Sequence, residues 1–185
     1  MEQVYFSFDI EADGASPMNN SLLSVGIVVF DRYGKELDSI EVNIEKRDEA
    51  EEDENTMKFW EKNPEAWNYC HQDTVSPTVA MEKIGSFYEK YKKLYKINWV
   101  AGPACFDWMF LKVYYSTFKT KNMPDIGYSC NCLSERKRAF VQYKHLTQTE
   151  FNTLELYWSE GLKGSHKAID DARVQGKIYC GMISG

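Results

Sequence analysis

Hydrophobic and polar residues follow strand-like patterns over the first part of the chain. In residues 3–10 apolar and polar side chains alternate, so that they fall on opposite faces of a strand. A nearly continuous apolar run at 21–31 is typical of a strand covered on both faces. Residues 35–45 alternate less regularly and predict a third strand. Because only short turns separate these segments, we expect them to form an antiparallel meander.

The rest of the chain is dominated by helical spacing. Helices are predicted at 55–62, 63–71, 76–96, 105–118, 134–144 and 165–183, a fourth strand at 97–102, and a turn with room for a short strand at 123–133. Asn55 or Thr56 would start the first helix, Asn63 would cap the second, and Ser76 before Pro77 would cap the third.

Composition and spacing predict the environment of two further segments, an acidic stretch and the last helix. The acidic stretch 45–55 is expected to be a solvated loop. In the last helix, Ala172, Gln175 and Tyr179 belong to a stripe that would pack against the sheet. A meander followed by alternating helices and a strand predicts a three-layer α/β domain with a mixed sheet.

Composition and length place further bounds on the molecule. The chain has 185 residues, 43% hydrophobic and 15% aromatic, which is typical of a folded protein and sufficient for a single domain over residues 1–185. No apolar run approaches the roughly 20 residues of a membrane span, and the N-terminus lacks the features of a signal peptide. Together with five cysteines in no framework spacing, this predicts a cytoplasmic protein with reduced thiols and no membrane contact.

Net charge limits the mode of nucleic-acid binding. At −6 the chain is too acidic for a broad electrostatic footprint on duplex nucleic acid. A local contact mediated by bound cations remains compatible with this charge. Cys130 and Cys132 form a pair without a second ligand pair nearby, which argues against a zinc site.

Four acidic residues stand out because their neighbours are of core type. Asp9 and Glu11 share the polar face of the first strand, Asp107 opens an aromatic helix, and Asp171 lies in the small, apolar start of the last helix. Converging carboxylates are costly unless they hold cations, and Mg²⁺ prefers oxygen ligands. Two such ions ~3.5–4 Å apart activate water and stabilise the leaving oxygen of a phosphodiester.

Each of these residues also has a simpler interpretation when it is taken alone. Asp9 and Glu11 could lie at a solvated strand end, Asp107 could be a first-turn residue stabilised by the helix dipole, and His166 could be a loop histidine. These interpretations do not explain why the residues occur together in one order. His71 and His145 have no comparable context and are interpreted as surface residues.

The segments FDIEADG, CFDWMFL and HKAIDDA resemble the three motifs of the DEDDh 3′→5′ exonucleases of the ribonuclease H-like superfamily, a group that includes ribonuclease T and oligoribonuclease. The matching positions are Asp9, Glu11, Asp107, His166, Ala168 and Asp171. The resemblance covers most of the chain and is strongest to phage- and virus-type members, whose HxAxDDAxxQG pattern the chain follows. Two departures are Pro103-Ala104, where His-Asn is common, and Ala12, where Thr is frequent.

The resemblance implies a ribonuclease H-like three-layer fold with a mixed five-stranded sheet, antiparallel in its first three strands, and helices on both faces. It implies a metal-dependent 3′→5′ exonuclease that hydrolyses phosphodiester bonds at the 3′ end of single-stranded DNA or RNA and releases nucleoside 5′-monophosphates. The two Mg²⁺ or Mn²⁺ ions would be held by Asp9, Glu11, Asp107 and Asp171. His166 would take the proton from the attacking water, a role that suits imidazole.

Asp170 and Asp171 compete for the last ligand position. Neighbouring helical residues point about 100° apart, so only one of them should face the ions. The motif spacing selects Asp171.

Aromatic and apolar residues supply candidate substrate contacts. Phe59 or Trp60 would stack on the terminal bases, while at least one of the two packs on the core. Leu22 and Leu23 would wedge between the last two bases or belong to the core. Ser24 and the backbone around Asn20 to Leu23 would contact the 3′-terminal sugar.

Two further features complete the expected substrate region. Ala12, directly after Glu11, is included in the substrate-binding set. The basic segment 135–145 either guides the phosphate backbone or forms a solvated helix face.

Alternative functions stay open at the level of sequence. The chain could be a catalytically weak nuclease-like module that binds nucleic acid or protein, or another metal-dependent phosphohydrolase acting on nucleotides. Homodimers recur in the resembled family, so a second copy is a candidate partner, although no dimer-specific pattern stands out. The choice between DNA and RNA depends on loop geometry that the sequence does not give.

Overall fold

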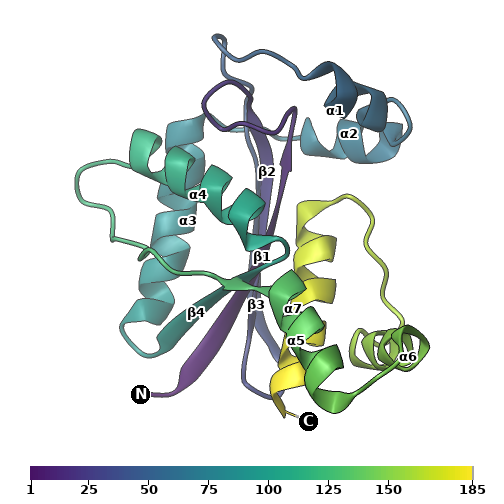
Figure 1. Cartoon of the computed structure of the whole chain (residues 1–185). Helices are drawn as coiled ribbons and strands as arrows, with labels where there is room; N and C mark the ends of the chain where they lie inside the picture. Colours follow the sequence, from purple (N-terminus) through teal and green to yellow (C-terminus); the bar gives the residue numbers. More distant parts are fainter. Residues whose placement is uncertain (185) are drawn as a thin grey trace.

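The computed structural model describes residues 1–184 and has a five-stranded mixed sheet at its centre (Figure 1). Its strands are β1 (Gln3–Ala12), β2 (Leu22–Phe30), β3 (Glu36–Asn43), β4 (Lys96–Ala101) and β5 (Asn131–Cys132). They are ordered β3-β2-β1-β4-β5, with β1, β2 and β3 antiparallel and β4 and β5 joined to β1 in parallel. The predicted mixed five-stranded sheet with an antiparallel first half is confirmed.

Helices cover both faces of this sheet, as predicted (Figure 1). They are α1 (Glu54–Trp60), α2 (Pro64–Cys70), α3 (Pro77–Lys92), α4 (Ala104–Phe118), α5 (Leu133–Lys144), α6 (Gln148–Trp158) and α7 (Ala168–Ser184). Helices α3 and α4 pack on one face and α7 on the other, where α5 and α6 pack against α7. Within the described residues, none of the helices combines the length and the apolar character needed to cross a membrane.

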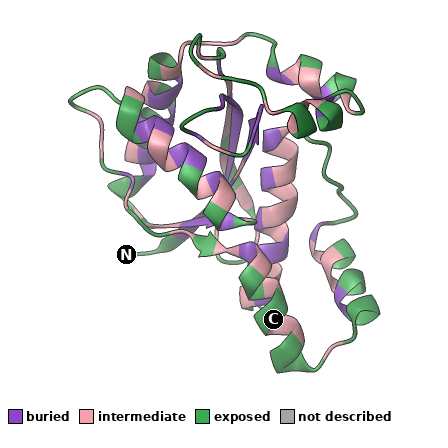
Figure 2. Ribbon diagram, turned by 45° about the horizontal axis from the view of Figure 1, so that its top comes forward, coloured by how far each residue is buried: buried purple, intermediate pink, exposed green. Residues whose placement is uncertain are grey.

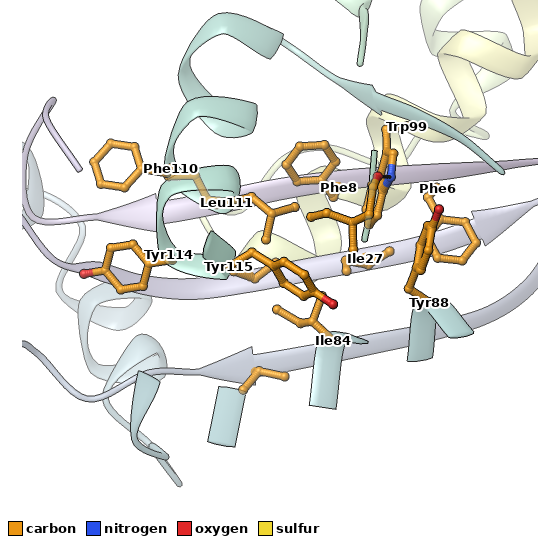
Figure 3. Packing of buried hydrophobic residues seen from close by; sticks show 14 of the residues in the cluster. Phe6, Phe8, Ile27, Ile84, Tyr88, Trp99, Phe110, Leu111, Tyr114 and Tyr115 are labelled. Atoms are coloured by element: carbon orange, nitrogen blue, oxygen red, sulfur yellow. Dashed lines mark hydrogen bonds between the residues drawn. The ribbon is translucent and has the colours of Figure 1, made fainter. Parts of the chain in front are cut away.

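The alternating pattern of β1 determines what each face of the sheet carries. Phe6, Phe8 and Ile10 are buried in the main core under α3 and α4 (Figure 3). The other face of β1 turns Asp9 and Glu11 toward α7, because successive side chains of a strand alternate. Figure 2 shows that burial is concentrated in the central strands and on the inner sides of the helices.

Helix α7 lies unusually close to the sheet because small residues line the contact. A Cβ atom on Gly26 of β2 would stand 2.3 Å from the backbone of Ala168, and one on Gly176 of α7 would stand 2.2 Å from the ring of Phe30. Such distances leave no room for any side chain. Since Gly26 lies directly opposite Asp9 in the sheet, this approach brings the start of α7 beside the β1 carboxylates.

Three element boundaries differ from the prediction, each for a local reason. Asp53, rather than Asn55 or Thr56, caps α1, and its Oδ1 accepts from the backbone of Thr56 at 2.8 Å. Helix α3 ends at Lys92 because Lys96 already pairs with β1. Helix α7 begins at Ala168 and not at residue 165, because His166 has a left-handed φ of 55° that a helix does not accommodate.

Helix α6 was not predicted, although its start carries a recognisable signal. The Thr147 side chain accepts from the backbone of Glu150, and the Glu150 side chain accepts from the backbone of Thr147, which is a capping box. Phe151 and Trp158 of α6 then pack on the cluster shared with α5 and α7.

The acidic segment 45–55 is only partly the solvated loop that its composition predicts. Its acidic residues other than Asp53 are exposed, but its backbone is fastened to the loop that follows β1. Glu51 N donates to Asn19 O at 2.8 Å, and Asp53 N donates to Asp13 O at 2.9 Å. Backbone pairing between the two loops, which composition does not reveal, thus fixes the approach to α1.

Replacing Gly26 with Ala is expected to destabilise the fold by about 3 kcal/mol, because the new methyl group meets rigid helix backbone rather than a mobile side chain. Urea unfolding of both proteins measures this. The matched change Gly161→Ala, where a Cβ atom meets nothing within 4 Å but φ is +75°, should cost only about 1 kcal/mol. Equal stability of Gly26→Ala and the unchanged protein would refute the close-packing argument.

Candidate active site

The predicted catalytic residues come from three elements that meet at the end of β1. Asp9 and Glu11 lie on β1, Asp107 lies in the first turn of α4, and Asp171 lies in the first turn of α7. His166 lies just before α7. The fold thus gathers residues that are far apart in the chain.

One group in this cluster has the geometry of a metal site. Glu11, His166 and Asp171 each offer a ligand atom, and these atoms lie within 4.8 Å of one another. Glu11 is 8% exposed, Asp171 is partly buried, and His166 is exposed to solvent. The group therefore has a buried acidic floor and an open side from which a substrate can approach.

Asp9 and Asp107 join this group through their charges. Burial raises the pKa of Asp9 well above its ordinary value, and the nearby Asp107, Glu11 and Asp171 raise it further. Burial, with help from Asp171 and Asp107, raises the pKa of Glu11 to about 9. Burial alone raises the pKa of Asp107 to about 7. The protein thus holds several carboxylates where their mutual repulsion is strong, and a bound cation would relieve it.

The hydrogen bonding of the carboxylates also leaves positions open for a cation. Asp107 is 3% exposed, and its buried Oδ2 has no hydrogen-bond partner within the protein. Oxygen ligands of this kind suit Mg²⁺ and Mn²⁺. The residues therefore fit the divalent ions that the sequence predicts.

His166 is held in place by its neighbours in the chain. Ser165 N donates to Asp171 Oδ1 at 2.9 Å, and Ile169 N donates to Glu41 Oε1 at 3.2 Å. The amine of Lys167 lies 4.5 Å above the ring of Tyr69. Contacts on both sides of His166 therefore stabilise its left-handed backbone.

Of the two adjacent aspartates, Asp171 lies in the cluster. Asp170 instead accepts from the Ser165 hydroxyl at 2.8 Å and pairs with Arg173 at 3.4 Å. Burial raises the pKa of Asp171, and the Ser165 backbone and His166 counteract that rise. This arrangement agrees with the selection of Asp171 by motif spacing.

A pocket of about 210 Å³ opens next to Glu11. It is lined by Ile10, Glu11, Ala12, Gly14, Ala15, Thr56, Phe59, Trp60 and Phe106. Phe59 is 38% exposed, and its ring meets the imidazole of His166 edge-on at 4.9 Å. The pocket is thus mainly apolar and leads to the carboxylates.

The two adjacent aromatics have separate roles. Trp60 is 2% exposed, and its Nε1 donates to the Ala12 carbonyl at 3.0 Å, so it supports the wall of the pocket from the core. A stacking role for Trp60 is therefore excluded by its burial, and Phe59 is the ring with an exposed surface.

Burial argues against the expected substrate contacts of three β2 side chains. Leu22, Leu23 and Ser24 are completely buried, because β2 is an inner strand covered on both faces. Leu23 packs with Trp60, and Leu22 donates its backbone N–H to the Tyr114 hydroxyl at 2.7 Å. Their side chains therefore cannot wedge between bases or reach a sugar.

The basic helix α5 uses its charges within the protein. Lys137 pairs with Glu155 at 2.6 Å, and Arg138 pairs with Glu135. The guanidinium of Arg136 lies 5.1 Å above the ring of Tyr179. These contacts favour the structural interpretation of segment 135–145 over a phosphate guide.

Two polar residues of the site were not singled out from the sequence. Gln175, which the helical pattern placed in a packing stripe, donates from Nε2 to Asp9 Oδ1 at 2.6 Å. Glu41 of β3 accepts from the start of α7 and from the Tyr69 hydroxyl. Gln175 could have been found from the sequence, because it lies one helical turn after Asp171 and therefore on the same side of the helix. No local pattern in the sequence distinguishes Glu41.

Comparison with known proteins gives one family match. The model of a family described as the 3′-5′ exoribonuclease Rv2179c-like domain matches residues 4–182. No curated protein sequence matches the chain.

Solved exonuclease structures share the fold at low identity. Zinc-bound E. coli exonuclease I in complex with single-stranded DNA superposes with a TM-score of 0.66 and 12% identity over 95% of this chain, which spans only 39% of that one. A 3′-exonuclease bound at the histone mRNA stem-loop gives 0.66 and 12%, covering 99% of this chain and 82% of that one. S. pombe Pop2p with Mg²⁺ and Mn²⁺ gives 0.56 and 12%, covering 95% and 81%. These structures confirm the predicted ribonuclease H-like fold, and the family model supports the resemblance to DEDDh-type exonucleases.

The raised carboxyl pKa values predict how stability depends on pH without divalent ions. A carboxyl group whose pKa is higher in the folded state stabilises the fold fully below its unfolded pKa, and that contribution is lost as the pH rises through the folded pKa. For Glu11 the window runs from its ordinary value of 4.5 to about 9. Melting temperatures in chelator should therefore fall over this range, and Mg²⁺ should restore them at the alkaline end.

Two variants assign this effect to the site. Glu11→Gln should make the melting temperature in chelator less dependent on pH, because the Glu11 carboxyl group, which must lose its proton as the pH rises, is no longer present. Glu65→Gln, at an exposed position on α2, should leave the decline as it is. Stability that rises with pH in chelator would contradict the electrostatic account of the site.

Proposed function

This chain belongs to the Rv2179c-like 3′-5′ exoribonuclease domain family, and on that basis we propose that it is a metal-dependent enzyme acting on single-stranded 3′ ends. It would release nucleoside 5′-monophosphates, with RNA as the substrate expected first. The observation that supports this most strongly is the grouping of Glu11, His166 and Asp171 within 4.8 Å beside an apolar pocket.

Four carboxylates would hold the metal ions in this proposal. Burial raises the pKa of all four groups, Asp9, Glu11, Asp107 and Asp171, and the charges of the other three add to the rise for Asp9. Mg²⁺ or Mn²⁺ bound by such groups supplies an activated water and neutralises charge on the phosphate. The structure of S. pombe Pop2p, which shares this fold, contains both ions.

His166 would act as the general base. It takes a proton from the attacking water as the new bond from oxygen to phosphorus forms, and the bond from phosphorus to the 3′ oxygen of the preceding nucleotide breaks. That oxygen is protonated to a 3′-hydroxyl, and His166 returns its proton to solvent. The exposed imidazole and the fixed backbone around it suit both steps.

The apolar pocket would bind the terminal nucleoside. Its volume of about 210 Å³ lies below the roughly 300–1,000 Å³ of pockets that enclose drug-sized ligands, so it suits one nucleoside better than a base pair. The exposed ring of Phe59 would stack on the base, and the small side chain of Ala12 would let the base approach the backbone closely. A single-stranded end follows from this size.

A nuclease-like module without catalysis is the second candidate. Such a module gains nothing from burying carboxylates that repel one another, and the unpartnered Oδ2 of Asp107 would only destabilise it. A phosphohydrolase acting on free nucleotides is the third candidate. The open side of the site, where His166 lies, favours a polymer end over an enclosed nucleotide.

Incubation of the protein with 5′-labelled single-stranded RNA and DNA tests the proposed function. In Mg²⁺ we expect a ladder that shortens from the 3′ end, abolished by EDTA and by Asp9→Ala. His166→Ala should lower kcat about 10²–10⁴-fold while Mn²⁺ binding persists, because the base is lost but the four carboxylates that would hold the ions stay in place. Intact oligonucleotide with undiminished binding would favour the module, and hydrolysis of free nucleotides alone would favour the phosphohydrolase.

Phe59→Ala should raise KM for single-stranded RNA about tenfold, because stacking on one base is lost while the carboxylates stay in place. Two variants serve as controls. Tyr143→Ala removes an aromatic ring that is 80% exposed on α5 and should leave KM unchanged. Trp60→Ala should instead lower the free energy of unfolding by about 3–5 kcal/mol. An unchanged KM for Phe59→Ala would remove this ring from the substrate site.

A further inference from the structure

The contact between Gln175 and Asp9 joins two of the elements that form the site. Gln175 lies four residues after Asp171 on α7, so both side chains project from the same side of the helix. Its Nε2 donates to Asp9 Oδ1 at 2.6 Å. Helix α7 thus supplies one carboxylate of the site directly and contacts a second one through this amide.

The surroundings of Asp9 make this donor important. The carboxylates of Asp107, Glu11 and Asp171 lie near it. Within the described residues, the amide of Gln175 is the one hydrogen-bond donor to the Asp9 carboxylate. One neutral amide therefore holds a carboxylate that lies among other acidic groups.

The orientation of the amide is restricted from its other end. A Cβ atom on Gly102 would stand 3.3 Å from Gln175 Oε1 and 3.1 Å from Leu133 Cβ, so the amide oxygen lies against the turn between β4 and α4. That oxygen is buried and has no hydrogen-bond partner. Gln175 is therefore wedged between this turn, which leads to Asp107, and the carboxylate of Asp9.

We propose that Gln175 is a positioning residue that orients Asp9 for metal binding, an inference that rests on the proposed function. By occupying Oδ1, the amide fixes the carboxylate and leaves Oδ2 for a cation. A neutral donor suits this task better than Lys or Arg, because a positive side chain would satisfy the charge of Asp9 and compete with the ion. Groups that orient metal ligands in this way commonly contribute 10–100-fold to metal affinity.

The test is a titration of the full chain with Mn²⁺, followed by electron paramagnetic resonance. Gln175→Met keeps the length of the side chain but removes the donor, and it should weaken Mn²⁺ binding about 10-fold or more. Its activity should recover as Mn²⁺ is raised, with KM for RNA unchanged. Gln148→Met, at an exposed amide of α6 that donates to Asn152, is the matched control and should bind Mn²⁺ normally.

A second variant separates positioning from a merely structural role. Gln175→Lys places a positive charge beside Asp9 and should weaken Mn²⁺ binding more than Gln175→Met does. A loss of stability in chelator together with normal Mn²⁺ affinity would show that Gln175 only packs.

Failure of this inference is distinguishable from failure of the proposed function. If the unchanged protein binds no Mn²⁺, the metal-dependent function itself is refuted. If the protein binds Mn²⁺, Asp9→Asn weakens that binding and Gln175→Met does not, only the positioning role is overturned.

Discussion

The close approach of α7 to β1 and β2 is the constraint on which the site depends. Gly26 and Gly176 lie where a Cβ atom would come within 2.3 Å of other atoms, so the helix rests almost directly on the strands. This contact places Asp171 beside Glu11 and puts Gln175 within reach of Asp9. A helix displaced by the thickness of one methyl group would separate the carboxylates from one another.

The close packing of α7 on the sheet brings buried carboxylates together, and their burial and mutual repulsion destabilise the fold. Asp9, Glu11 and Asp107 are held where burial raises their pKa values, and repulsion among the carboxylates adds to the rise for Asp9 and Glu11. A fold selected for stability alone would replace them with apolar side chains. Their presence together with His166 is what a cation-dependent hydrolase requires, and a neutral amide rather than a cationic side chain beside Asp9 agrees with that role.

The substrate side of the molecule depends on a different set of contacts. Trp60 anchors α1 to the end of β1 through the Ala12 carbonyl, and the acidic loop is fastened by backbone hydrogen bonds to the loop after β1. These contacts hold Phe59 in the lining of the pocket, edge-on to His166. The adjacent residues Phe59 and Trp60 thus have different environments: Trp60 packs in the core, and Phe59 is exposed at the surface.

Sequence alone determined the main architecture and the candidate catalytic set. Alternation along β1 predicted which face carries Asp9 and Glu11, because it is a local periodicity. The resemblance to the exonuclease motif selected Asp171 over Asp170. Tertiary structure decided the burial of Leu22, Leu23 and Ser24, the exposure of Phe59 rather than Trp60, the start of α7 at Ala168 and the partner of Gln175. Each of these depends on which distant segment packs against the residue, and Gln175 and Asp9 are separated by 166 positions in the chain. Local patterns predict how a segment folds, but the neighbours that cover it are set only when the sheet and its helices assemble.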